Sequence, residues 1–391
     1  MLCLHNATII TPLRLRQGSV LIEDGRIIDI VDRYEAGADW QIIDCTGYYL
    51  TPGFIDLHVH GGGGYDIMCG NRDHIIEMCT AHARTGTTSI VPTTFAMPLE
   101  DQYLAIDTVR AAQAESTDAN ILGIHLEGPF LSPGQAGAQS PDGLLVPATT
   151  DYIPLLDRWP GGIKMVGVAP ELDGAMELGR ELAARGIVGT IAHSDASFET
   201  CMLALENGYT DITHIYSACS TVVRKNSYRT AGVVEAGLYS DDFTTQMIGD
   251  LRHLPASLLK LICRVKGASR AYLISDGLEF TATEPVEGTT YIGSNGLEVI
   301  YEDKVMKLSH RQAFAGSCTP LAQMVANLHK EVDIPLTEAV RMASLTPAQR
   351  IRIDDRKGMV AVGRDADIVL MDASLNVRLS MVMGKVVYSE L

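Results

Sequence analysis

Residues 53–64 read GFIDLHVHGGGG, and this stretch decides the fold because it shows how a buried strand ends. Two histidines, His58 and His60, close the apolar run, and four glycines follow them. Side chains alternate along a strand, so residues two apart point to the same side. We therefore expect both imidazoles to face one interior, beside a loop whose missing side chains leave room for metal, water and substrate.

Seven more apolar runs follow along the chain, and helix-like stretches separate them. The runs are TTSIVPTT (87–94), NILGIHLEGP (120–129), IKMVGVAPE (163–171), IVGTIAHSD (187–195), DITHIYSA (211–218), TTQMIGD (244–250) and AYLISDG (271–277). Near-continuous apolar strands that alternate with helices predict a parallel sheet buried on both faces. Eight such strands close a (β/α)8 barrel. A doubly wound open sheet is the alternative, but it would place a Gly-rich phosphate fingerprint where this chain has His-Val-His.

Both ends of the chain have a different character from the middle. The stretch GSVLIEDGRIIDIV (18–31) holds two β-branched runs around an Asp-Gly pair, which is typical of a hairpin, and residues 367–391 also resemble short strands. We predict an α/β fold in which a TIM-like barrel (53–356) carries one small β-sandwich built from both termini (1–52 and 357–391). Two separate edge hairpins are the alternative.

The composition is that of a globular protein with a large core, since 46% of the 391 residues are apolar and 20% are charged. The net charge of −17 argues against nucleic acid or an anionic membrane as a partner, and an anionic substrate would need local cations. The eight cysteines form no Cys-x-x-Cys pair, which predicts reduced, mostly buried thiols. The start of the sequence is unlike a signal peptide, and no apolar run approaches the roughly 20 residues of a membrane helix, so we expect a cytoplasmic protein.

Potential metal ligands stand at the ends of five predicted strands. For a single histidine, a hydrogen-bonded core residue is the commoner interpretation. The carboxyl ends of barrel strands meet at one rim, however, so side chains there converge. Imidazole and carboxylate together suit zinc, iron or another divalent transition metal. The residues are His58, His60, Glu127, His193, His214 and Asp276.

The sequence resembles the N-acetylglucosamine-6-phosphate deacetylase family within the amidohydrolase superfamily. The matching stretches are PGFIDLHVHG, HLEGPFLSPGQAGAQ, GTIAHSDAS, THIYSA, LISDG, FAGS and DDRKGMVAVGRDADIVLMD, in the family's order over nearly the whole chain. The resemblance implies the barrel with its split sandwich, a divalent metal and commonly a homodimer. It also implies hydrolysis of the N-acetyl group of N-acetylglucosamine 6-phosphate, which gives glucosamine 6-phosphate and acetate.

By position, the family assigns the main metal to Glu127, His193 and His214. Family members with His-x-His can hold two metals, which makes His58 and His60 candidates for a second position bridged by Glu127. Many other amidohydrolases bridge their metals with a lysine at the end of strand four. This chain has Lys164 at the start of that strand and Ala169-Pro170 at its end.

The resemblance also assigns roles in catalysis and substrate binding. Asp276 would take a proton from water and return it to the departing amine. His253 would contact the substrate and stabilise the developing oxyanion. Arg229 matches an arginine that grips phosphate, which suits a guanidinium fork. The other substrate positions are Ala138, Gln139, Ser217, Ala218, Ala315 and Gly316.

The sequence departs from the family on the phosphate and sugar side. Ser217-Ala218-Cys219 replaces Asn-Ala-Met, RTAG (229–232) replaces Arg-Glu-Pro-Gly, and the segment between them is longer and adds Arg224 and Lys225. These added cations belong either to a solvated loop or to further phosphate contacts. A sister enzyme acting on another N-acyl amino sugar, such as the galactosamine epimer or an unphosphorylated sugar, is therefore the first alternative. A non-catalytic barrel scaffold is a remote one.

Overall fold

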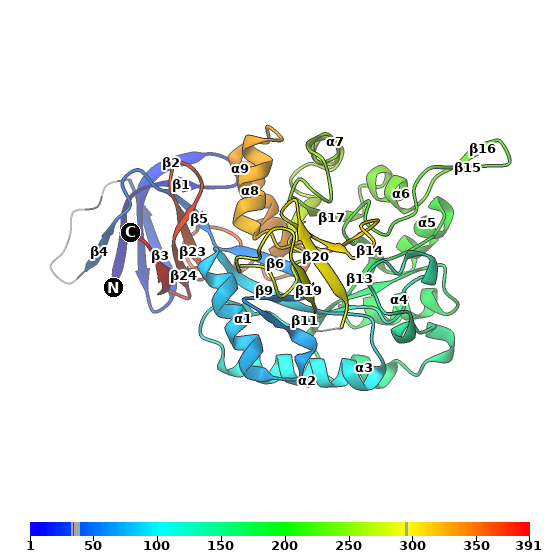
Figure 1. The fold of residues 1–391 in the computed structure, drawn as a ribbon. Coiled ribbons are helices and arrows are strands. Elements are labelled where there is room, and N and C mark those ends of the chain that lie inside the picture. Colours follow the sequence, from blue (N-terminus) through cyan, green and yellow to red (C-terminus); the bar gives the residue numbers. More distant parts are fainter. Residues whose placement is uncertain (33, 35–39, 294–295) are drawn as a thin grey trace.

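The computed structural model describes the whole chain except residues 33, 35–39, 294 and 295. Figure 1 shows a barrel surrounded by helices and, at its left, a separate sheet that contains both ends of the chain. The eight apolar runs of the sequence are the strands of the barrel.

The barrel strands pair in parallel, mostly in chain order. They are β6 (Phe54–Val59), β9 (Thr87–Thr94), β11 (Ile124–Glu127), β12 (Ile163–Val168), β13 (Val188–Ile191), β14 (Tyr209–Ile212), β17 (Thr244–Ile248) and β18 (Ala271–Ile274), with a short β10 (Asn120–Ile121) beside β9. The last strand returns to the first, since Asp276 N donates to His58 O over 2.9 Å and His60 N donates to Gly277 O over 2.8 Å. The barrel is therefore nearly closed, and the doubly wound alternative is wrong.

Helices cover the outside of the barrel (Figure 1). Asn71 begins the first of them by accepting a hydrogen bond from Asp73 N, and Ser197 begins the fifth by accepting one from Thr200 N. The helices are α1 (Arg72–Arg84), α2 (Leu99–Glu115), α3 (Ile153–Asp157), α4 (Ala175–Ala184), α5 (Phe198–Glu206), α6 (Val233–Tyr239), α7 (Ala256–Lys266), α8 (Leu321–Lys330), α9 (Leu336–Met342) and α10 (Leu345–Arg350).

The two termini form one continuous, mostly antiparallel sheet. Its strands are β1 (Leu2–Ile10), β2 (Leu15–Glu23), β3 (Arg26–Val31), β4 (Gln41–Asp44), β5 (Tyr49–Pro52), β23 (Ile368–Met371), β24 (Val377–Val382) and β25 (Lys385–Ser389). The N- and C-terminal segments join where β5 pairs with β23, with Leu50 opposite Leu370. The alternative of two separate hairpins is therefore wrong.

Three small elements were not predicted. The hairpin β15 (Val223–Lys225) and β16 (Tyr228–Thr230) projects from the barrel, at the right in Figure 1. A four-stranded sheet of β19 (Thr290–Ile292), β20 (Glu298–Glu302), β21 (Val305–Leu308) and β22 (Phe314–Gly316) follows the last barrel strand. The glycine loop after β6 forms the pair β7 (Gly61–Gly62) and β8 (Tyr65–Asp66).

Two expectations about the chain as a whole can be compared with the described residues. Five of the eight cysteines are buried, and all eight are free thiols. Among the described residues, no helix combines the length and the apolar character that a membrane crossing requires.

A buried ion pair fixes the segment that leads back into the terminal sheet. Lys357 Nζ donates to Asp367 and lies 3.2 Å from Asp365 Oδ2, and all three side chains are at most 7% exposed. Replacing the lysine by an apolar residue would leave the buried carboxyl group of Asp367 without its cation, with the Met383 amide as its other hydrogen-bond donor.

We predict that Lys357→Met lowers the free energy of unfolding by about 3–5 kcal/mol. The matched control is Arg311→Met, which removes an exposed ion pair with Glu302 and should cost about 0–1 kcal/mol. Urea unfolding of both variants measures the difference. Equal midpoints would show that the buried pair does not stabilise the fold.

Candidate metal centre and active site

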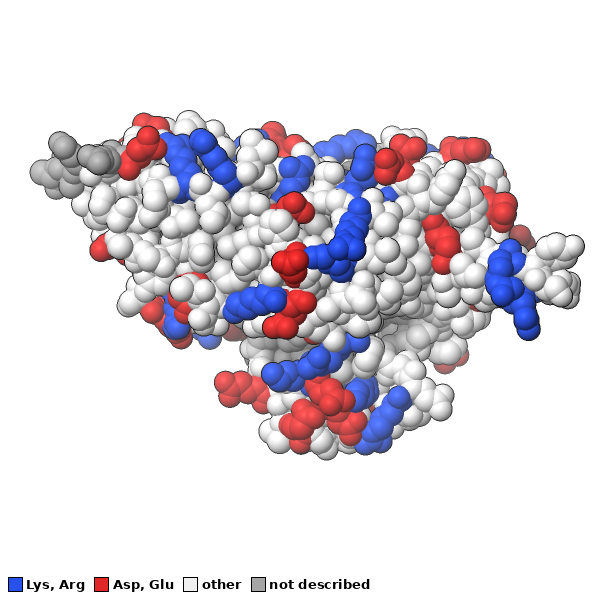
Figure 2. All heavy atoms as spheres, turned by 90° about the horizontal axis from the view of Figure 1, so that it is seen from above, with Lys and Arg blue, Asp and Glu red and all other residues white. Residues whose placement is uncertain are grey.

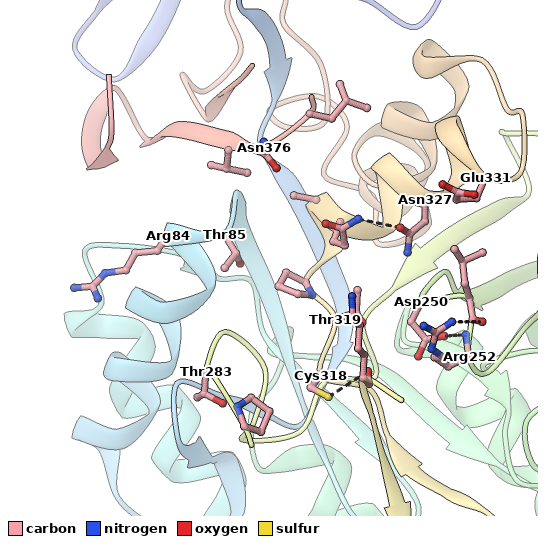
Figure 3. A pocket seen from close by; sticks show the side chains of 18 of the residues that line it. Arg84, Thr85, Asp250, Arg252, Thr283, Cys318, Thr319, Asn327, Glu331 and Asn376 are labelled. Atoms are coloured by element: carbon pink, nitrogen blue, oxygen red, sulfur yellow. Dashed lines mark hydrogen bonds between the residues drawn. The ribbon is translucent and has the colours of Figure 1, made fainter. Parts of the chain in front are cut away.

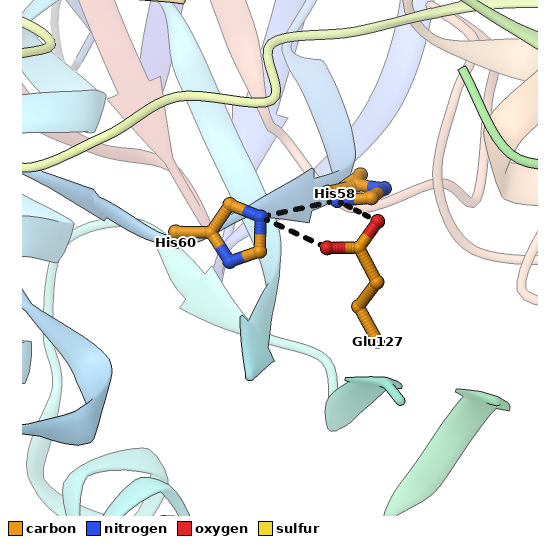
Figure 4. Close-up of side chains that lie close together, drawn as sticks. All are labelled: His58, His60 and Glu127. Atoms are coloured by element: carbon orange, nitrogen blue, oxygen red, sulfur yellow. Dashed lines mark hydrogen bonds and ion pairs between the residues drawn. The ribbon is translucent and has the colours of Figure 1, made fainter. Parts of the chain in front are cut away.

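The predicted ligands meet at the carboxyl ends of the barrel strands. Two groups could each hold a metal ion, and Glu127 belongs to both. Figure 4 shows the first group, in which the Glu127 side chain points between the rings of His58 and His60. The second group joins Glu127 to His193 and His214.

One buried carboxylate lies among four imidazoles. Oε1 of Glu127 is 2.9 Å from the Nε2 atom of His214, 3.2 Å from that of His193 and 3.4 Å from that of His58. Its Oε2 is 3.4 Å from His60 Nε2. Burial alone would raise the pKa of Glu127, but the surrounding histidines outweigh it and hold the pKa well below its usual range.

The histidines turn the same nitrogen toward the carboxylate because their other nitrogen is engaged. Nδ1 of His60 bonds Thr93 O (2.9 Å), that of His193 bonds Gln135 O (2.7 Å) and that of His214 bonds Ser217 O (3.1 Å). A carbonyl oxygen can only accept, so Nδ1 carries the proton in these three rings. A ring that is neutral with this proton presents a lone pair on Nε2 to a metal. Burial would lower the pKa of His60, but hydrogen bonds to Asp276 and Glu127 raise it to about 10. Glu127 likewise raises the pKa of His193, so without a metal the protonated rings are favoured beside the carboxylates.

This donor set fits a divalent metal. The Nε2 atoms of His58 and His60 lie 3.2 Å apart, and carboxylate oxygens lie beside them. Lone pairs and anions gathered so closely repel one another unless a cation lies between them. Imidazole nitrogen with one carboxylate is a common ligand set for zinc and for other transition metals. The two oxygens of Glu127 can serve one position each.

Asp276 faces the same group from the end of β18. Its Oδ1 lies 3.3 Å from His60 Nε2 and 3.5 Å from His58 Nε2. Burial would raise the pKa of Asp276, but the hydrogen bond to His60 and the charges of the imidazoles lower it to about 2. The carboxylate is therefore ionised and able to accept a proton.

Three of these residues have a left-handed backbone. The φ angles are 44° at His193, 23° at His214 and 48° at Asp276. Each such conformation costs on the order of 1–3 kcal/mol in a residue that is not glycine, and it persists where the surrounding structure enforces it. The strand ends are thus held in strained positions that aim the side chains at one point.

A cavity of about 430 Å³ opens beside the ligands. His60, Glu127, His193, His214 and Asp276 line it, whereas His58 is fully buried behind them. Seven of the positions predicted to contact substrate also line it, namely Ala138, Gln139, Ser217, Ala218, His253, Ala315 and Gly316. Gln139 has a further contact, since its Nε2 donates to Glu127 Oε2 over 2.6 Å.

His253 enters the cavity as half of an ion pair. Its Nδ1 donates to Asp250 Oδ2 over 2.7 Å, in a contact that is almost fully buried. Burial alone would lower the pKa of His253, but the hydrogen bond and the charge of Asp250 outweigh it and raise the pKa. The cationic imidazolium is favoured, which suits a ring that meets an anionic oxygen.

The sequence analysis missed several residues of the cavity wall. Phe95 stacks on the His60 ring at 4.0 Å between centroids, and Phe314 lies 4.7 Å from the His253 ring. Tyr216 and Gln135 also line the cavity. Phe95 directly follows a strand end, which is a usable signal, but Phe314 comes from the unpredicted small sheet.

Arg229 lies away from this cavity. It belongs to β16 of the projecting hairpin, opposite Arg224 on β15, and both side chains are exposed. It is not among the described residues that line the cavity. Figure 2 shows basic side chains at the hairpin's end of the molecule, while acidic and basic groups alternate over the rest of that face.

A larger cavity of about 630 Å³ lies between the barrel and the terminal sheet (Figure 3). Arg84, Arg252, Thr319, Asn327 and Asn376 are among its lining residues, and it contains no member of the two ligand groups. It reaches Asp250, the partner of His253, from the other side. The chemistry therefore points to the smaller cavity.

This chain is similar to known enzymes over nearly its whole length. Residues 49–217 and 292–387 match the model of the amidohydrolase family. An N-acetylglucosamine-6-phosphate deacetylase of Bacillus subtilis (strain 168) is 31% identical over 380 residues, which cover 96% of this chain and 93% of the relative. An N-acetylgalactosamine-6-phosphate deacetylase of Escherichia coli O157:H7 is 29% identical and covers 86% of this chain and 87% of its own length.

A solved structure shares the whole architecture. The crystal structure of N-acetylglucosamine-6-phosphate deacetylase from Pasteurella multocida superposes with a TM-score of 0.91 at 26% sequence identity. The superposition covers 98% of each chain. The barrel and the terminal sheet are thus both part of the likeness.

We predict that Glu127→Ala abolishes metal binding at both positions, because its carboxylate belongs to both ligand groups. His58→Ala should lose one position only, since the group of Glu127, His193 and His214 stays complete. Elemental analysis of the purified variants, each divided by protein concentration, makes the comparison. A Glu127→Ala protein with wild-type metal content would contradict the shared ligand.

Proposed function

This chain belongs to the amidohydrolase family, and we propose that it removes the N-acetyl group of N-acetylglucosamine 6-phosphate, giving glucosamine 6-phosphate and acetate in amino-sugar catabolism. It is a hydrolase that acts on an amide. The observation that carries the proposal is the convergence of Glu127, four imidazoles and Asp276 on one cavity. Relatives that share the barrel and the terminal sheet are deacetylases of this substrate class.

The reaction follows from what each side chain can do. Glu127, His193 and His214 would hold a divalent metal, with zinc or iron the first candidates, which would supply Lewis acidity toward a carbonyl and toward water. Asp276, ionised and beside the ligands, takes the proton of the attacking water and delivers it to the departing amine. His253, favoured as a cation by Asp250, stabilises negative charge on the substrate.

Small residues form the sugar side of the cavity. These small residues leave room for a sugar beside the metal ligands, and Ser217 adds a hydroxyl. They are Ala138, Ala218, Ala315 and Gly316. A volume of about 430 Å³ suits a monosaccharide phosphate, because ligand cavities of roughly 300–1,000 Å³ are typical for small molecules. Their backbone groups are the proposed contacts with the sugar.

Other features of the protein are proposed from the same family. We assign the nearly closed barrel to the TIM-like (β/α)8 class and the terminal sheet to a β-sandwich, with boundaries at 1–52 and 357–391 and the barrel at 53–356. A homodimer and a cytoplasmic location are expected. Arg229 does not line the active-site cavity of its own chain, so a contact with phosphate requires movement of the hairpin or a second copy of the chain.

The galactosamine epimer is the second candidate substrate. A relative named for N-acetylgalactosamine 6-phosphate is nearly as similar as those named for the glucosamine compound. The departure at Ser217 lines the cavity, whereas the departure at RTAG (229–232) begins on the exposed hairpin outside it. The complete ligand set and the position of Asp276 beside it argue against a non-catalytic scaffold.

The test is a panel of N-acetyl hexosamines, each with and without the 6-phosphate. We expect the highest kcat/KM for N-acetylglucosamine 6-phosphate. A preference for the galactosamine epimer would favour the sister enzyme, and no preference for phosphate would contradict the proposed substrate.

If the hairpin or a second copy of the chain brings Arg229 to the phosphate, Arg229→Ala should reduce kcat/KM for the 6-phosphate about 30-fold to 10³-fold, since losing a charge-assisted contact costs roughly 2–4 kcal/mol. An unchanged kcat/KM would show that Arg229 does not reach the phosphate. The same variant should barely change turnover of the unphosphorylated sugar. Arg224→Ala is the matched control from the opposite strand of the hairpin and should have less effect. Equal damage to both substrates would make Arg229 structural.

Asp276→Asn should lower kcat by at least about 10², because an amide cannot accept the proton that Asp276 takes from water. Metal content and substrate binding should persist, since Asp276 belongs to neither ligand group. Steady-state kinetics with parallel metal analysis checks both parts. A variant with near-wild-type kcat would show that another group moves the proton.

Asp250→Asn tests the cation on His253. Asp250 raises the pKa of His253, so its neutral replacement should lower that pKa and the imidazolium should lose its proton at a lower pH. The alkaline fall of kcat/KM should therefore move to lower pH. Unchanged pH profiles over pH 5–9 would show that His253 acts as a neutral ring.

A further inference from the structure

One ligand ring is oriented differently from the others. His60, His193 and His214 donate from Nδ1 to backbone carbonyl oxygens, whereas Nδ1 of His58 faces a side chain, Gln246 Oε1, at 3.2 Å. A carbonyl fixes the proton on Nδ1 by itself. An amide side chain does so only if its oxygen, and not its nitrogen, faces the ring.

Asp211 decides which way the amide of Gln246 points. Gln246 Nε2 donates to Asp211 Oδ2 over 2.7 Å, and Tyr272 OH donates to the same oxygen over 2.9 Å. Thr244 Oγ1 donates to the other oxygen. Donors thus surround the carboxylate, so the amide nitrogen belongs on its side and the amide oxygen belongs on the side of His58.

The whole connection is sealed inside the barrel. His58, Gln246, Asp211 and Tyr272 are all 0% exposed, so water is not at hand to replace a lost partner. Asp211 stands on β14, Gln246 on β17 and Tyr272 on β18, which are neighbouring strands. Turning the amide over would break both of its hydrogen bonds and set its nitrogen against a protonated Nδ1.

We infer that Gln246 is a positioning residue for the metal centre: anchored by Asp211, it keeps the proton of His58 on Nδ1 and leaves Nε2 open to a metal. Groups that hold the far nitrogen of a ligand histidine commonly change metal affinity 10–100-fold. His58 belongs to the group with His60 and not to the group with His193 and His214. Gln246 therefore supports a second, separately filled metal position.

The second metal position itself is what the family resemblance implies, and the inference concerns the residue that supports it. It rests on the proposed metal dependence but not on the proposed sugar, so it can be tested without substrate. A failure of the substrate panel would leave this inference standing, and a single metal in the wild-type protein would overturn it.

The probe is zinc alone, titrated into metal-free protein by calorimetry, with bound metal counted by elemental analysis. The wild type should bind two zinc ions per chain. Gln246→Met keeps a similar volume and removes both hydrogen bonds, so the site that His58→Ala abolishes should lose 10-fold to 100-fold in affinity and the other should change little. Equal weakening of both sites, or of neither, would overturn the inference.

Thr190→Val is the matched control. It removes a different fully buried hydrogen bond, at 2.7 Å between Thr190 Oγ1 on β13 and Thr213 Oγ1, which directly follows β14. Two zinc ions with wild-type affinities are expected. A selective loss of one zinc in this control as well would show that any interior defect has the same effect, and would also overturn the inference.

Exchanging the hydrogen-bond donor and acceptor between positions 246 and 211 tests whether Gln246 acts through its hydrogen bonds or only by filling space. Gln246→Glu alone sets two carboxylates against each other, so the second zinc should be lost or the fold damaged. Adding Asp211→Asn restores the contact between the two side chains, because the introduced carboxylate accepts from His58 and from the introduced amide. The Tyr272 hydroxyl, which donates to the replaced oxygen, then accepts from the amide nitrogen instead. Recovery of the second zinc in the double variant is expected. A double variant that folds but binds one zinc would overturn the inference, even if Gln246→Met fails to fold.

Discussion

The structure depends on one buried carboxylate that cannot remain uncompensated. Glu127 is 2% exposed in its side chain and lies within 3.4 Å of four imidazole nitrogens. Removing a charge from water costs several kcal/mol unless partners replace the solvent. Because the rings offer lone pairs once their Nδ1 atoms are engaged, the partner that completes the arrangement is a cation. The barrel brings the four rings and the carboxylate together from different strand ends.

The groups behind the ligands keep this arrangement in place. Backbone carbonyls hold three of the imidazoles, Gln246 holds the fourth, and Gln139 donates to Glu127 itself. The left-handed backbone at His193 and Asp276 costs free energy locally. Hydrogen bonds that close the barrel offset this cost, since the amide of Asp276 donates to the carbonyl of His58 on the first strand. Strain, closure and ligand geometry therefore coincide at one rim.

The two sides of the cavity are built in different ways. The metal side consists of strand ends within the barrel, which are buried and connected to the core. On the sugar side, Ala315 and Gly316 come from the small inserted sheet, and the arginine expected at the phosphate stands on an exposed hairpin. Elements outside the barrel can change without disturbing the ligands. Of the departures from the family pattern, RTAG (229–232) begins on this hairpin, whereas Ser217 follows β14 and its carbonyl accepts from His214.

The sequence by itself determined the strands, their parallel order and the set of side chains that the structure brings together as candidate metal ligands. The apolar runs and their spacing were enough for this prediction. An apolar run that ends in His or Glu indicates a buried strand whose last side chain reaches the rim of the barrel, as at His58 and Glu127. The sequence also predicted that Asp276 would stand beside the ligands, which the distances confirm.

Only the tertiary structure decided the contacts that join residues far apart in the chain. Nothing in TTQMIGD indicates that Gln246 meets His58, because the two lie 188 positions apart and meet through barrel closure. The same holds for the stacking of Phe95 on His60 and for the placement of Arg229, whose hairpin has too few apolar residues to reveal where it packs. Local patterns fix what a segment is, whereas its partners depend on how all the segments pack.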